Sequence, residues 1–85
     1  MEYVVVAFRS RAHTVKFSEI LKRNAIPNEI VNTPKEAGVG CGLSVKISKE
    51  RFYAVKNITF SVGLNSFAGF FLIRTNKGQR IVKSI

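Results

Sequence analysis

The sequence has only one cysteine, Cys41, and its 85 residues include no tryptophan and just two prolines. A single cysteine cannot form an internal disulfide, which favours a reducing, cytoplasmic environment. No apolar run approaches the roughly 20 residues that a membrane-spanning helix requires. The N-terminal stretch MEYVVVAF opens with an acid and precedes no small-residue cleavage site, unlike a signal peptide. We therefore expect a cytoplasmic protein with no membrane partner.

Acidic side chains are also scarce. The chain has 14 Lys and Arg residues against 5 Asp and Glu, which gives a net charge of +9. After Glu36 the only acid is Glu50, whereas eight basic residues lie between Lys46 and Lys83. This imbalance favours anionic partners, such as nucleic acid, an acidic protein surface or a phosphorylated ligand. It is equally consistent with a solvated basic surface that serves no partner.

Hydrophobic residues make up 46% of the chain, which is enough for one modest core in a single domain spanning residues 1–85. Short β-branched or aromatic segments, and one segment in which apolar and polar residues alternate, predict strands. These strands are expected over residues 3–8, 29–32, 43–48 and 70–75, with 80–85 as an additional C-terminal strand.

Two further segments show the apolar spacing of helices. The first spans residues 11–24, with Ser10 as its N-cap. The second follows Ser48, which we expect to cap it, and runs for about four turns to Gly63. The predicted inward face of this second helix consists of Phe52, Val55, Ile58, Thr59 and Val62.

The order β-α-β-β-α-β predicts a ferredoxin-like α+β fold, in which right-handed crossovers place both helices on one face of an antiparallel sheet. The opposite face would be bare, with Tyr3, Val5 and Ala7, or the alternate residues, exposed on it. Because an open apolar sheet face is usually an interaction surface, we expect a homodimer or another protein partner there. Tyr53 and Phe60, on the outer side of the second helix, would extend such a contact or pack against the C-terminal residues.

The segment GVGCGLSVKI, residues 38–47, places Cys41 between two glycines just before a strand. In the predicted fold this strand begins at the sheet edge where the first strand ends, so Cys41 should lie close to residues 8–13. A phosphate-binding loop is disfavoured, because such loops open a helix and carry a Gly-Lys-Ser/Thr phrase. A metal site is also disfavoured, because one Cys and one His cannot fill a zinc shell.

A reactive thiol fits this position best, while a hydrolytic Cys–His pair with His13 and an inert buried cysteine remain alternatives. The flanking Gly40 and Gly42 would leave the sulfur accessible. Basic side chains and a helix N-terminus stabilise a thiolate. The candidates for this role are Arg9, Arg11, His13 and Lys35.

Three short sequence motifs occur in a fixed order along the first half of the chain. A helix-ending phrase, Ile20–Lys22 with Ala25–Pro27, precedes a Thr-Pro dipeptide, Thr33–Pro34, and then a Cys-Gly that leads into an apolar strand, Cys41–Leu43. In this order they resemble a family of small bacterial proteins described as selenium/sulfur carrier-like. The likeness covers roughly residues 3–60.

The sequence around Cys41 differs in two ways from that of sulfur-carrier proteins. The loop before the cysteine is Ala37–Gly40, where small polar residues are expected, and Gly42 stands where better-understood sulfur-transfer proteins have Pro after the carrier cysteine. Both departures could change how accessible the thiol is and which hydrogen bonds it makes. The structure of this loop therefore bears directly on the carrier hypothesis.

The resemblance implies that Cys41 accepts sulfur or selenium from a donor protein and hands it to an acceptor protein. Thr33, Pro34, Gly40 and Gly42 would form the loop around it. The resemblance implies no cofactor, and a carrier rather than an enzyme. The alternative hypothesis is a binding module without covalent chemistry, which would use its basic surface for nucleic acid or another anion, or its open sheet face for a protein.

Overall fold

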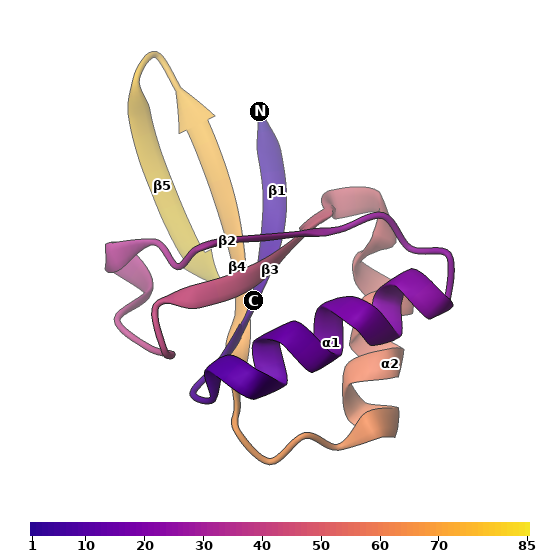
Figure 1. Cartoon of the computed structure of the whole chain (residues 1–85). Helices are drawn as coiled ribbons and strands as arrows, with labels where there is room; N and C mark the ends of the chain where they lie inside the picture. The colour runs from indigo at the N-terminus through magenta and orange to yellow at the C-terminus, as the bar shows by residue number, and fades with distance from the viewer.

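The computed structural model of the protein describes all 85 residues, which form two helices packed on one face of a five-stranded antiparallel sheet (Figure 1). The strands are β1 (Glu2–Phe8), β2 (Glu29–Asn32), β3 (Leu43–Ser48), β4 (Phe67–Asn76) and β5 (Gln79–Ser84). The helices are α1 (Arg11–Arg23) and α2 (Phe52–Val62), and two short 3-10 turns are η1 (Lys35–Ala37) and η2 (Lys49–Arg51).

The sheet order is β2-β3-β1-β4-β5, and every neighbouring pair is antiparallel. This confirms the ferredoxin-like arrangement and the additional C-terminal strand. β1 occupies the centre of the sheet because the run Val4–Phe8 is apolar on both faces, and all five of these residues are buried. Neither helix is long and apolar enough to cross a bilayer.

The predicted N-terminal cap is present on the first helix and absent from the second. Ser10 caps α1, because its side chain accepts a hydrogen bond from the backbone N–H of His13 at 3.2 Å. Ser48 makes no such bond, so the prediction that it caps the second helix is wrong. Ser48 is still paired with Tyr3 in the sheet, and the chain makes the η2 turn before α2 begins at Phe52.

The larger core lies between the sheet and the helices, where Phe8, Phe17 and Leu21 are completely buried. Each such side chain contributes about 1.5–3 kcal/mol to folding. The rings of Phe8 and Phe17 lie 5.1 Å apart. Of the predicted inward face of α2, Val55 and Thr59 are buried and two more residues are half-buried. Val62 is 39% exposed in the last turn, so its predicted burial is wrong.

The second face of the sheet is covered, which corrects the expectation of an open apolar face. Val5, Ala7 and Ile73 are completely buried there, although no helix lies on that side. The cover comes from the loop between β2 and β3, whose Ala37 and Val39 pack against this cluster. The sheet twists so strongly that this loop comes to lie beside β5 (Figure 1). The chain therefore covers this face itself, and Val5 and Ala7 are not available to a second copy.

Candidate functional site

Cys41 lies in the loop of residues 33–42, at the sheet edge where β1 ends. Its backbone N–H donates a 3.0 Å hydrogen bond to the carbonyl of Phe8, the last residue of β1. The N–H of Thr33 donates to the carbonyl of Gly42 at 2.9 Å, which closes the loop at its base. These bonds confirm the predicted proximity of Cys41 to residues 8–13.

The glycines on either side of Cys41 are required for two different reasons. Gly40 and Gly42 have φ angles of +94° and +96°, which L side chains rarely adopt. At Gly40 a Cβ atom would also lie 3.2 Å from the carbonyl oxygen of Phe8, so the loop backbone packs directly on the end of β1. At Gly42 a Cβ atom would meet nothing within 4 Å. The backbone before Cys41 is thus packed against the end of β1, whereas the backbone after it borders open space.

The half-buried sulfur of Cys41 has two polar neighbours. Its Sγ lies 3.7 Å from Thr14 Oγ1 and 3.6 Å from the carbonyl oxygen of Leu43. The Leu43 carbonyl can accept a hydrogen bond from the thiol S–H, and the Thr14 hydroxyl can donate one to a thiolate. The site therefore offers a hydrogen-bond partner to both protonation states of the sulfur.

Thr14 is a site residue that the sequence reasoning missed. It is completely buried on α1, and its hydroxyl also lies 3.2 Å from the Ser10 carbonyl and 3.4 Å from the Leu43 carbonyl. Its burial could have been predicted, because Thr14 lies three residues before Phe17 and residues at that spacing share one helix face. A hydroxyl on a buried helix face must have polar partners, and here these are the sulfur and the carbonyls around it.

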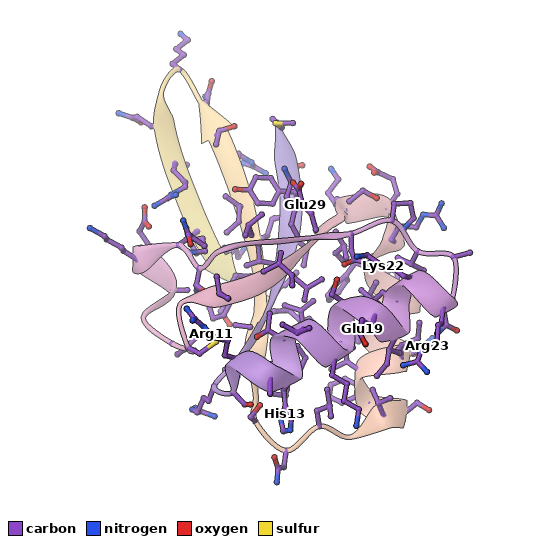
Figure 2. The ribbon with its side chains drawn as sticks, viewed as in Figure 1. Arg11, His13, Glu19, Lys22, Arg23 and Glu29 are labelled. Carbon is purple, nitrogen blue, oxygen red and sulfur yellow. The ribbon has the colours of Figure 1, made fainter.

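The predicted basic residues lie at different places around the site. Arg11 lies one turn before Thr14 on α1, and its side chain extends toward the loop of residues 33–42 (Figure 2). Lys35 is exposed in η1 on the same loop. Arg9 is exposed, and its backbone N–H donates to the Ser66 carbonyl at 2.8 Å.

His13 points away from the sulfur. Its Nδ1 lies 2.6 Å from Ser66 Oγ, in the connection between α2 and β4 (Figure 2). The imidazole is therefore engaged by Ser66 and makes no hydrogen bond to Cys41. This arrangement disfavours the alternative of a hydrolytic Cys–His pair, which requires direct contact between base and nucleophile.

A hollow of about 250 Å³ opens in the loop of residues 33–42, and Cys41 itself is not among the residues that line it. Seven residues line this hollow. Two are Gly38 and Val39, and the other five were predicted from the sequence as site residues. The five are Thr33, Pro34, Lys35, Gly40 and Gly42. Thr33 Oγ1 shares a 2.7 Å hydrogen bond with Ser44 Oγ, and Pro34 is buried, so the Thr-Pro phrase anchors the loop to β3. No group of three or more His, Cys, Asp or Glu residues is placed to hold a metal ion.

The comparisons with known proteins give one finding. A family model described as "Putative Se/S carrier protein-like" matches residues 3–65, which include β1 through α2 and the whole Cys41 loop. No curated protein and no solved structure matches the chain. Because the matched residues make up well over half of the 85 in the sequence, the chain belongs to the putative Se/S carrier protein-like family.

Proposed function

We propose that the protein carries sulfur or selenium on the thiol of Cys41. One observation carries this proposal: the half-buried Sγ stands between two glycines of positive φ and has Thr14 Oγ1 at 3.7 Å as a potential donor to its thiolate. Membership of a family named for Se/S carriage supports it. A cytoplasmic location would keep the single thiol reduced between transfers.

The loading step is an exchange among three sulfur atoms. The Cys41 thiolate attacks the outer sulfur of a donor persulfide, R–S–SH, and a new S–S bond forms. The S–S bond of the donor breaks, and its inner sulfur leaves as the thiolate R–S⁻. The product is Cys41–S–SH, which keeps the proton of the transferred group. Electrons pass only between the sulfur atoms, so no further oxidant or cofactor is needed.

The unloading step reverses these roles. An acceptor thiolate attacks the terminal sulfur of Cys41–S–SH, and the Cys41 thiolate leaves. Selenium would follow the same course from a donor R–S–SeH. One cysteine is sufficient for both steps, because the second thiol comes from the donor or acceptor protein each time.

The surroundings of Cys41 fit each part of this cycle. The Thr14 hydroxyl donates to the thiolate when it attacks and again when it leaves. Arg11 and the N-terminal end of α1 provide positive charge beside the anionic sulfur. Gly42, at which a Cβ atom would meet nothing within 4 Å, leaves room for the approaching group.

The direct test is uptake of sulfur from glutathione persulfide, followed by intact mass spectrometry. The folded protein should gain one sulfur atom, which dithiothreitol removes, and it should react faster than the same chain unfolded in urea. Cys41→Ser should gain none. If the folded protein takes up sulfur no faster than the unfolded chain, the proposal is refuted, because the fold would then not increase the reactivity of the Cys41 thiol.

A matched pair of variants tests the role of Thr14. Thr14→Val keeps the shape of the side chain but removes the hydroxyl, and Thr14→Ser keeps the hydroxyl. A hydrogen bond to a charged group contributes about 1.5–3 kcal/mol, so Thr14→Val should slow loading by about tenfold or more. Thr14→Ser should load at close to the wild-type rate, and equal rates in the two variants would contradict this role.

A further inference from the structure

The part of the chain that forms α2, β4 and β5 contains no carboxylate side chain. From Arg51 to Ile85 there are six basic residues and no Asp or Glu. Arg74 and Arg80 pair with acids from elsewhere, Glu2 and Glu36, while the other four make no ion pair. The family match ends at residue 65, so β4 and β5 lie outside the matched residues.

One flank of α2 carries exposed rings beside a cation. Tyr53 is 77% exposed and Phe60 is 61% exposed. Their flank faces β4, because the ring of Phe60 lies 6.1 Å from that of Phe70. Between the two rings along the helix stands Lys56, whose Nζ lies 5.9 Å from the centre of the Phe52 ring. Two flat apolar surfaces and a free cation are thus presented together.

The same side of the sheet continues this surface along the β4–β5 hairpin. Leu72 is paired with Lys83, and Arg74 is paired with Ile81, on the face that the helices cover only in part. These four residues line a hollow of about 130 Å³, and Ile81 is 54% exposed. The N–H of Ile85 donates to the Phe70 carbonyl at 3.0 Å, so β5 reaches back to the aromatic residues beside α2.

These residues together form what we call the acid-free face. It alternates apolar surfaces with cations and is defined by Tyr53, Lys56, Phe60, Leu72, Ile81 and Lys83. The hydrogen-bond partners of Cys41 are Phe8, Thr14 and Leu43, and none of them belongs to the acid-free face. The acid-free face is therefore separate from the thiol site.

We propose that the acid-free face binds single-stranded nucleic acid. Phosphates would contact Lys56 and Lys83, while bases would stack on Tyr53 and Phe60, which is how single strands are held without base-specific contacts. An extended polyanion is repelled by every unpaired carboxylate that it passes, and α2, β4 and β5 contain no Asp or Glu. Glu2 and Glu50 lie beside Arg74 at the edge of this surface, where Glu2 is paired with Lys49 and Arg74. The remaining excess of cations favours this ligand over a local protein contact. A second copy fits poorly, because it would oppose cations to cations.

The test is fluorescence anisotropy with a fluorescein-labelled single-stranded oligouridine over a series of salt concentrations. Each phosphate contact on a single strand contributes about −0.7 to the slope of log K against log salt. Lys56→Gln/Lys83→Gln should therefore make the slope shallower by about 1.4. The matched control, Lys16→Gln/Lys22→Gln, makes the same charge change at two exposed residues of α1 and should leave the slope unchanged.

A second variant separates stacking from charge. Tyr53→Ala should weaken binding by about tenfold and leave the salt slope as it is, because a stacked base is lost but no phosphate contact. Since Tyr53 is largely exposed, this change spares the core. Cys41→Ser should bind as the wild type does, so the carrier proposal and this one can fail independently.

Four results would overturn the proposal. They are no saturable binding at low salt, equal loss of slope in the two lysine pairs, equal affinity for a duplex of the same length, and no effect of Tyr53→Ala. Binding to vesicles of phosphatidylcholine and phosphatidylserine without binding to the oligonucleotide would also overturn it, and would assign the face to an anionic bilayer surface.

Discussion

Replacing Gly40 by alanine should destabilise the protein more than the same change at Gly38 or Gly42. All three glycines have positive φ, at +67°, +94° and +96° for Gly38, Gly40 and Gly42. A non-glycine residue in such a conformation costs about 1–2 kcal/mol, which is the loss expected for Gly38→Ala and Gly42→Ala. Only at Gly40 would the new methyl group meet the body of the protein, 3.2 Å from the Phe8 carbonyl oxygen.

That contact cannot relax easily, because Phe8 is buried at the end of the central strand and its carbonyl already accepts the N–H of Cys41. Overpacking of this kind adds about 1–3 kcal/mol, so Gly40→Ala should lose about 2–5 kcal/mol in total. The displaced loop would also uncover the half-buried sulfur. Alkylation of Cys41 under native conditions should therefore be faster in Gly40→Ala than in Gly38→Ala.

Urea unfolding followed by circular dichroism measures the free energies, and alkylation with iodoacetamide measures access to the thiol. The three variants should share one m value, since each unfolds from the same fold. If their free energies of unfolding agree within about 0.5 kcal/mol, the loop does not pack on β1 as described, and the positioning of Cys41 by Phe8 is refuted.

Three further predictions concern the surroundings of the site and the sheet. Hydrogen bonds from Lys49 and then Arg74 lower the pKa of Glu2 from 4.5 to about 2, so the carboxylate contributes stability that is present above pH 4.5 and is lost as the pH falls toward 2. Glu2→Gln should flatten this acid limb in thermal unfolding, and an unchanged limb would contradict the assignment. Ser66→Ala should cost about 1 kcal/mol by removing the partner of His13. It should leave sulfur loading unchanged, and a clear loss of loading would mean that His13 serves the thiol after all. Thr33→Val leaves the buried Ser44 hydroxyl without its partner and should cost about 1–3 kcal/mol in urea unfolding. Adding Ser44→Ala should recover part of that loss, whereas additive losses would show that the two hydroxyls are not coupled.

Local patterns were sufficient to predict most of the fold. The β-branched run near the N-terminus and the cap at Ser10 are signals within a few residues of the chain. The handedness of the crossovers then placed Cys41 beside the end of β1, which the Phe8 hydrogen bond confirms.

The parts that sequence could not predict depend on contacts between distant segments. The loop of residues 33–42 has no periodic pattern, so nothing in it indicates that Ala37 and Val39 cover the second sheet face. The partner of His13 is Ser66, 53 residues further along the chain. Thr14 has an ordinary helical environment in sequence, and its role depends on a loop that begins at residue 33.

The central position of β1 has a consequence for biosynthesis. β1 is the first strand to leave the ribosome, but one of its two neighbours is β4, in which Arg74 pairs with Glu2. Until residues 67–76 emerge, the apolar run of β1 has an unpaired edge that can associate with other chains. Contacts between such distant residues also make folding slow relative to a helical domain of the same size. The sheet can therefore be completed only after β4 has been translated, and a nascent chain stalled before β4 would leave this edge of β1 exposed.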